Sequence, residues 1–136
     1  MRSTGFHHVD LVVSSIERSL PFYRELLGPI GWHGQSEVEG ERGETIWYLV
    51  GPDCAVGLRE ATSEGGLPYD RYRVGLHHLA FQAPSREVVD ERVRWARAQG
   101  VEIENDPKEY GYMPGYYAGF FRDPDGIKLE VLHVPE

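Results

Sequence analysis

The chain has 136 residues, of which 40% are hydrophobic, and this length and apolar content suffice for one domain with a substantial core. Its formal net charge of −8 opposes contact with a phosphate backbone, so we expect no nucleic acid partner. The sequence has no apolar stretch near the roughly 20 residues of a membrane span, no apolar segment typical of an export signal, and a single cysteine, Cys54. We therefore expect a soluble, cytoplasmic protein without an internal disulfide.

The first predicted strand covers residues 6–13, where polar and apolar side chains alternate. His8, Asp10 and Val12 share one face, and the opposite face is apolar, which is typical of a half-buried strand. Later in this half, apolar stretches predict three more strands at about 33–39, 44–50 and 54–61.

A helix is predicted directly after the first strand. Ser14 and Glu17 form a capping-box pattern, and apolar residues recur at helical spacing up to Gly28. Pro21 lies inside this pattern and lacks the N–H that a helix interior needs, so the helix either kinks or begins near Ser19.

The second half repeats this order of elements. We expect a strand at 76–83 and then a helix capped by Ser85 and closed by Gly100. Three strands should follow at 101–105, 116–122 and 127–134, the last two joined by a turn in Asp-Pro-Asp-Gly at 123–126.

Sliding the chain along itself shows that the halves are related in sequence as well. The segment 6–9, Phe-His-His-Val, falls on 76–79, Leu-His-His-Leu, at an offset of seventy positions. Pro-Asp at 52–53 falls on Pro-Asp at 124–125, at an offset of seventy-two. The sequence therefore predicts two βαβββ repeats, at about 5–62 and 75–135.

Three motifs in these repeats give the chain a resemblance to the vicinal oxygen chelate superfamily of glyoxalases, bleomycin resistance proteins and extradiol dioxygenases. They are His8 followed by VDLVVSSIERSLPFYRELLG, His78 followed by LAFQA, and FFRDPDGIKLEVLH around Glu130. The resemblance implies an α+β fold in a single glyoxalase-like domain, 1–136, with the two repeats forming a cupped, mostly antiparallel half-barrel. It also implies one divalent metal ion held by His8, His78 and Glu130, a small-molecule substrate and a homodimer.

Elementary chemistry favours the same three residues as ligands. Each lies in an alternating strand whose opposite face is apolar, and a polar group on the inward face of a sheet needs a partner or water. Imidazole and carboxylate suit Fe, Mn, Zn or Ni, and the sequence does not choose among these metals. The alternative is that the histidines are hydrogen-bonded structural residues, which is the expectation for His7 and His77 on the opposite strand faces.

The family uses a fourth ligand position, and this sequence departs from the family there. An offset of seventy-two places Leu58 opposite Glu130, and leucine cannot bind a metal. Glu60 lies two residues further on the same face, so a small shift of register would restore a carboxylate as a catalytic base. Without that shift, the three-ligand pattern resembles thiol transferases and the two-histidine, one-carboxylate set of non-haem iron oxygenases.

Other polar residues complete the set of candidates. The loop 109–117 holds four tyrosines, of which Tyr117 is our candidate for a general acid or a substrate-orienting group. Asp10 and Gln82 share faces with the two histidines and could orient them. Arg59 and Arg122 could bind a carboxylate or phosphate of the substrate.

Two functions remain open at this point. The first is a metal-dependent enzyme acting on a small oxygen-rich molecule, as a dioxygenase, lyase, isomerase or thiol transferase. The second is a metal-free, bleomycin-resistance-like binding protein. The retention of three metal-competent residues favours the enzyme, because sequestration of a drug does not need them. A purely structural protein is the third alternative.

Overall fold

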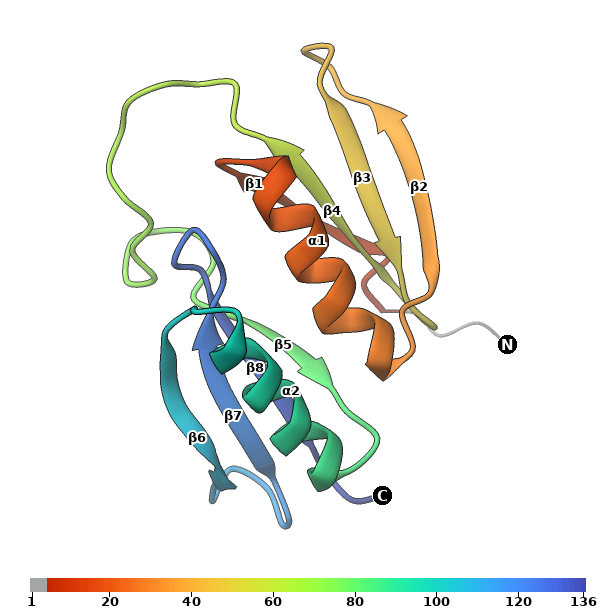
Figure 1. Ribbon diagram of the computed structural model, residues 1–136, viewed down its shortest axis with the longest axis vertical. Helices are drawn as coiled ribbons and strands as arrows, with labels where there is room; N and C mark the ends of the chain where they lie inside the picture. The colour runs from red at the N-terminus through yellow and green to blue at the C-terminus, as the bar shows by residue number, and fades with distance from the viewer. Residues whose placement is uncertain (1–4) are drawn as a thin grey trace. The chain divides into compact units, whose positions relative to one another are not determined.

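A computed structural model describes residues 5–136 of the chain (Figure 1). Residues 1–4, which belong to the N-terminal segment where no export signal is expected, lie outside the described residues. The chain divides into two compact units with their boundary between Gly66 and Leu67, so that each unit holds one repeat. No helix within residues 5–136 is both long enough and apolar enough to cross a membrane.

The first unit is a four-stranded sheet with one long helix. Its sheet has the order β1-β4-β3-β2, in which β1 and β4 are parallel and the other neighbours are antiparallel. Its elements in chain order are β1 (His8–Val13), α1 (Ile16–Leu27), the short 3-10 helix η1 (Gly28–Ile30), β2 (Gly34–Glu39), β3 (Thr45–Val50) and β4 (Ala55–Glu60).

The second unit has the same plan. Its sheet has the order β5-β8-β7-β6, again with a parallel first pair and antiparallel neighbours elsewhere. Its elements are β5 (Leu79–Gln82), α2 (Arg86–Ala98), β6 (Ile103–Glu109), β7 (Tyr117–Arg122) and β8 (Lys128–His133). The predicted α+β class and the two βαβββ repeats are confirmed.

The start of α1 differs from the prediction. Ser15, not Ser14, is the N-cap, and its hydroxyl accepts a hydrogen bond from the Arg18 N–H. The helix begins at Ile16 and continues through Pro21, so the alternative of a start near Ser19 is wrong. The helix tolerates the proline because six buried side chains anchor it to the sheet, and these are Ser19, Leu20, Phe22, Tyr23, Leu26 and Leu27.

Strand β6 is the other clear difference. The sequence predicts its end near residue 105, but it continues to Glu109 and includes Pro107. Register shifts on both sides of Asn105 interrupt its pairing with β7, and β6 is the edge strand of its sheet. A proline is tolerated at such a place because no neighbouring strand needs its missing N–H.

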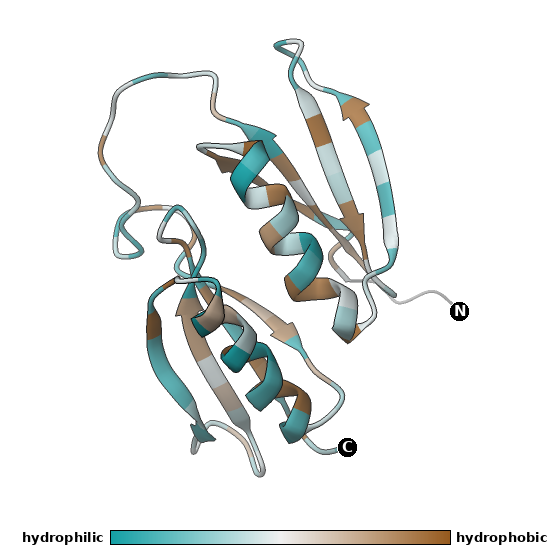
Figure 2. Cartoon of the chain, viewed as in Figure 1, coloured by the Kyte–Doolittle hydropathy of each residue, from teal (hydrophilic) through white to brown (hydrophobic). Residues whose placement is uncertain are grey.

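In each unit the helix covers one face of the sheet and the core lies in between (Figure 1). Both helices carry hydrophilic and hydrophobic residues side by side along their length, as amphipathic helices do (Figure 2). Leu58 in β4 and Leu129 and Val131 in β8 are fully buried on the helix-covered faces. Because neighbouring side chains of a strand point to opposite faces, Glu130, between Leu129 and Val131, lies on the face away from the helix. Asp10, which pairs with the neighbour of Leu58, does the same in the first unit.

Candidate metal centre

The second unit brings two of the predicted ligands together. His78 precedes β5 and Glu130 lies in β8, and the distance from His78 Nε2 to Glu130 Oε1 is 3.0 Å. In the register of the two strands Glu130 lies opposite Ala80, whose small side chain leaves room for the carboxylate. Only 3% of the Glu130 side chain is exposed, against 34% of His78, so the pair has a buried carboxylate and an accessible imidazole.

Tyr116 holds the other oxygen of the same carboxylate. Its hydroxyl donates a hydrogen bond to Glu130 Oε2, and burial together with this carboxylate raises the pKa of Tyr116 well above its ordinary value. The phenol therefore stays protonated and remains a donor at neutral pH. Glu130 is thus fixed from two sides, by His78 at one oxygen and by Tyr116 at the other.

Our candidate from the sequence was the neighbouring tyrosine. The Tyr117 hydroxyl donates to Asp90 of α2 at 2.6 Å, on the helix-covered face of β7, so its suggested role at the substrate stays a prediction. The alternation of the strand carries the signal that would have selected Tyr116. Phe120 lies opposite Glu130 in the β7–β8 register. Tyr116 lies four residues before Phe120, and alternation therefore places both side chains on the same face of the sheet.

An aromatic and aliphatic cluster backs the carboxylate. Ala118, Phe120 and Leu132 are buried there, and Tyr110, Tyr116 and Val134 pack against them. The Tyr110 hydroxyl is buried, and it has no hydrogen-bond partner among the described residues. These apolar surroundings strengthen the electrostatic interactions of Glu130, because the local dielectric constant is lower than in water.

The first unit contains the third predicted ligand. His8 opens β1, and its Nε2 lies 4.0 Å from Asp10 Oδ1. The second oxygen of Asp10 is occupied, because Arg59 donates to Oδ2 at 2.7 Å and the Tyr48 hydroxyl donates to it at 3.2 Å. Burial and the Asp10 carboxylate raise the pKa of Tyr48. Asp10 Oδ1 thus lies near His8, and the suggested role of Asp10 in orienting this histidine stays a prediction.

A broad hollow of about 890 Å³ opens beside this histidine in the first unit. It is lined by residues from β1, β2, β3 and the β3–β4 turn, among them His8, Tyr48, Val50 and Cys54. Burial raises the pKa of the Cys54 thiol, so this cysteine is a neutral thiol near pH 7 and a weak nucleophile. The hollow has the mixed apolar and polar lining that small-molecule sites share.

The predicted equivalence of Leu58 and Glu130 is wrong by one residue. Asp10 lies opposite Gly57 in the first sheet and Ala80 lies opposite Glu130 in the second, so Gly57 is the counterpart of Glu130 at an offset of seventy-three. Leu58 points to the helix-covered core instead. The correction keeps the conclusion that β4 supplies no ligand at this position, because glycine has no side chain.

Glu60 lies on the same face of β4 as Leu58. Its Oε1 accepts a hydrogen bond from the Ile16 N–H at 3.0 Å, which satisfies a free amide at the start of α1. This contact gives Glu60 a structural role, and its suggested role as a base stays a prediction.

The other histidine of each His-His pair, His7 or His77, contacts the ring of the histidine that follows it. His7 Nδ1 lies 2.9 Å from His8 Nδ1, and His77 Nδ1 lies 2.8 Å from His78 Nδ1. Because the Nδ1 atom of His8 is engaged by its neighbour, Nε2 is the nitrogen of His8 left to face a ligand, whereas both ring nitrogens of His78 have a partner, His77 at Nδ1 and Glu130 at Nε2. Within residues 5–136, no group of three His, Cys, Asp or Glu side chains forms a complete metal site inside either unit.

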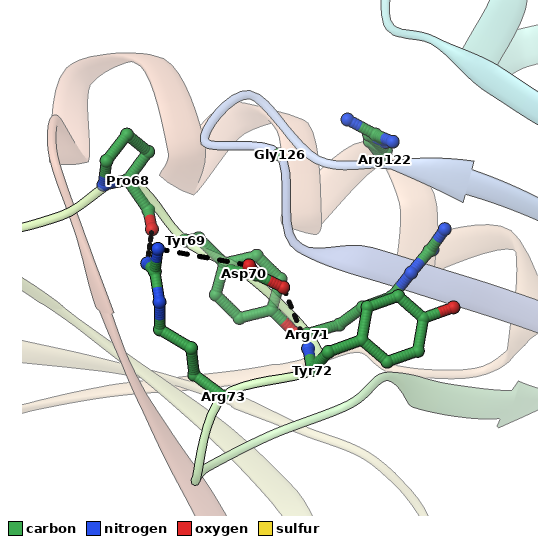
Figure 3. Close-up of a pocket in the computed structure, with 8 residues that line it drawn as sticks. All are labelled: Pro68, Tyr69, Asp70, Arg71, Tyr72, Arg73, Arg122 and Gly126. Carbon is green, nitrogen blue, oxygen red and sulfur yellow. Dashed lines mark hydrogen bonds and ion pairs between the residues drawn. The ribbon is translucent and has the colours of Figure 1, made fainter.

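A smaller hollow of about 280 Å³ lies in the second unit, in the segment that precedes β5 (Figure 3). Its three arginines suggest an anion site, but their charges are compensated. Arg71 and Arg122 both donate to Glu104, Arg122 also pairs with Glu102 at 3.2 Å, and Arg73 pairs with Asp70 at 3.9 Å. A substrate anion would therefore have to compete with Glu104 for Arg122, and with Asp10 for Arg59.

Comparisons with known proteins bear on this site. Residues 5–131 match the family model of the Glyoxalase/Bleomycin resistance protein/Dioxygenase superfamily. The chain is 34% identical over 132 residues to the uncharacterized protein YqjT of Bacillus subtilis, covering 93% of this chain and 96% of YqjT. It is 27% identical to the metallothiol transferase FosB of Staphylococcus epidermidis, covering 98% of this chain and 84% of FosB. The crystal structure of a glyoxylase/bleomycin resistance protein/dioxygenase domain from Frankia sp. EAN1pec superposes with a TM-score of 0.78 at 26% identity, covering 98% of this chain and 94% of that domain.

Proposed function

The chain belongs to the glyoxalase/bleomycin resistance protein/dioxygenase superfamily, and from this premise we propose that it is an enzyme that uses one divalent metal ion. The proposed ligands are His78 and Glu130 of the second unit and His8 of the first. The substrate is a small oxygen-rich molecule that offers two neighbouring oxygen atoms.

The spacing of His78 and Glu130 is the observation that carries this proposal. Two atoms that each lie about 2.1 Å from one ion are about 3.0 Å apart when they bind at right angles. His78 Nε2 and Glu130 Oε1 are hydrogen-bonded at 3.0 Å, so an ion bound by both atoms would take the place of the proton between them, and Tyr116 donates to the other oxygen of this buried carboxylate. The donor set fits an ion such as Mn²⁺, Fe²⁺, Zn²⁺ or Ni²⁺.

A bound ion would supply Lewis-acid stabilisation of negative charge that develops on the substrate oxygens. The residues of the chain do the rest. Glu130 keeps its orientation because Tyr116 donates to its far oxygen, and His77 holds the His78 ring through Nδ1. The hollow beside His8 offers the substrate a partly apolar wall.

Among reactions of this type, we propose thiol transfer as the first to assay. FosB, a metallothiol transferase, is 27% identical to this chain over 98% of its length. The resemblance seen in the sequence implies a three-ligand set like that of thiol transferases. Cys54 is poorly suited to act as the nucleophile because its thiol pKa is raised, so the thiol would come from a co-substrate. The alternative is a binding protein of the bleomycin-resistance type, favoured by the size of the hollow in the first unit.

Elemental analysis of protein purified without oxygen tests the proposal. We expect about one equivalent of a transition metal in the wild type and its loss in both His8→Ala and Glu130→Ala. Glu109→Ala removes an exposed carboxylate from the end of β6 and serves as the control, with metal content expected to match the wild type. A wild-type protein that holds no metal and takes up none of the four ions would overturn the proposal in favour of metal-free ligand binding.

A homodimer in the cytoplasm is the assembly that we propose. Light scattering on the purified protein measures the mass in solution, and a monomeric mass would contradict the proposed homodimer.

A further inference from the structure

A lysine lies beside the His78–Glu130 pair on the same sheet of the second unit. Lys128 comes two residues before Glu130 in β8, so both side chains lie on the face that α2 does not cover. Two residues of a strand span about 6.6 Å, so the lysine begins close to the proposed metal ligands. Its ammonium lies over the Phe120 ring, with 4.6 Å between Nζ and the ring centroid. The His78 ring also contacts Phe120, at 6.3 Å between centroids, so the lysine and the histidine adjoin one aromatic ring.

The Lys128 ammonium has no ion-pair partner. Among the described residues, no carboxylate lies within ion-pair distance of its Nζ. Glu130 is the nearest carboxylate along the strand, but His78 engages one of its oxygens and Tyr116 the other. Lys128 is partly buried, and an ammonium that leaves water needs an opposing charge or acceptors for its hydrogen bonds. The Phe120 ring attracts the cation, but it supplies no oxygen acceptor for the three N–H groups.

A second cation lies across the sheet from this one. Arg122 of β7 is opposite Lys128 in the strand register, and like charges at opposite positions destabilise a sheet. Arg122 turns toward β6, where it donates to Glu104 and pairs with Glu102. The carboxylates of β6 therefore compensate Arg122 and leave Lys128 without a counterion.

The first unit shows that the fold does not need a lysine at this position. The equivalence of Gly57 and Glu130 extends along both strands. Two residues earlier, the first unit has Ala55 where the second unit has Lys128. The partner of Ala55 on β3 is Val50, so neither member of that pair is charged. The same sheet position is thus filled by two apolar residues in one repeat, and the requirements of the fold do not explain the lysine in the other.

We propose that Lys128 binds an oxyanion of the substrate, which is a carboxylate, phosphate or phosphonate group beyond the two oxygens that chelate the metal. This inference rests on the proposed function, because it takes a metal ion to be bound by His78 and Glu130 in the same unit. An ammonium suits such a group, since it carries a full charge and donates three hydrogen bonds. The substrate is therefore a small anionic molecule, and the charge of Lys128 selects it over a neutral molecule of the same shape.

The test compares chelators with and without a second anionic group on protein loaded with Zn²⁺. Acetohydroxamate offers two neighbouring oxygens to the metal. The monohydroxamates of malonic, succinic and glutaric acid offer the same two oxygens and add a carboxylate at increasing reach. Titration calorimetry gives the affinity of each ligand. We expect at least one of the three acids to bind about 10-fold or more tightly than acetohydroxamate, as one hydrogen bond between charged groups would provide.

Variants of the two lysines identify the source of this preference. Lys128→Gln should remove the preference and leave the affinity for acetohydroxamate unchanged, whereas Lys128→Arg keeps the charge and should keep most of the preference. Lys128→Ala copies Ala55 of the first unit and should behave as Lys128→Gln does. The matched control is Lys108→Gln, which changes a lysine whose ammonium lies 5.0 Å from the centroid of the Tyr110 ring. This control should match the wild type with every ligand.

An NMR measurement separates contact with the ligand from an indirect effect. The chain has two lysines, so lysine labelled with carbon-13 at Cε gives two signals, and the spectrum of Lys128→Gln assigns them. The preferred acid should shift the Lys128 signal and leave the Lys108 signal in place. Acetohydroxamate should shift the Lys128 signal less than the acid does.

Two results would overturn the inference, and they differ from each other. If the wild type binds Zn²⁺ but binds none of the acids more tightly than acetohydroxamate, or keeps a preference in Lys128→Gln, the metal site stands and Lys128 is not the anion site. If the wild type takes up neither Zn²⁺ nor any other of the four ions, the proposed function fails and the inference fails with it.

Discussion

Replacing Tyr116 by phenylalanine removes one hydroxyl group from the buried side of Glu130 and preserves the ring. That hydroxyl donates to a carboxylate whose side chain is 3% exposed, so water has little room to replace it. A hydrogen bond to a charged group contributes about 1.5–3 kcal/mol, and a buried acceptor that loses its donor bears the desolvation cost. We expect Tyr116→Phe to lower the free energy of unfolding by about 2 kcal/mol in metal-free protein.

Tyr110→Phe is the matched control for this experiment. The Tyr110 ring packs in the same cluster, and its hydroxyl is buried without a hydrogen-bond partner among the described residues. Its removal should leave stability unchanged or raise it slightly, since an unsatisfied buried polar group is lost. Urea unfolding at pH 7 with a chelator present gives both free energies from the midpoint and the slope. Equal losses in the two variants would refute the view that Tyr116 stabilises Glu130 through its hydroxyl.

Two further predictions concern a helix cap and an ion pair. Ser15→Ala should lower the free energy of unfolding by about 1 kcal/mol, whereas Ser14→Ala should have a smaller effect because Ser14 is not the N-cap; urea unfolding of both variants checks this. Burial opposes ionisation of Glu104, but hydrogen bonds and charges of Arg71 and Arg122 outweigh it and lower the pKa of that carboxyl below its ordinary 4.5. The ionised Glu104 carboxylate therefore stabilises the fold above about pH 4.5, and this contribution is lost as the pH falls further. In urea unfolding at decreasing pH, the difference in free energy of unfolding between wild type and Glu104→Gln should shrink. A difference that grows below pH 4.5 would contradict this prediction.

Much of the fold follows from the sequence because the repeat gives each pattern twice. The His-His pairs at 7–8 and 77–78 mark the two first strands, and the turn at 123–126 forms as expected, with Asp123 Oδ1 accepting from the Asp125 and Ile127 amides. Strand and helix types were therefore predictable. Their ends were not, because caps and edge pairing depend on tertiary contacts.

The register error near the site has a physical cause, which is the two-residue period of a strand. A shift of one residue moves a side chain to the other face of a sheet. The prediction that Leu58 corresponds to Glu130, where Gly57 is the counterpart, is a shift of this size. The partners of Asp10 were beyond reach for another reason, since Tyr48 and Arg59 come from strands whose pairing with β1 no local pattern reveals.

The central claim is that one metal ion binds histidines from both repeats, and pulsed EPR on a bound Cu²⁺ ion tests it most directly. The remote nitrogen of each coordinated imidazole modulates the echo, so the number of bound histidines can be counted. We predict two imidazoles in the wild type and one in each of His8→Ala and His78→Ala. A wild-type spectrum with a single imidazole, unchanged by His8→Ala, would contradict the claim.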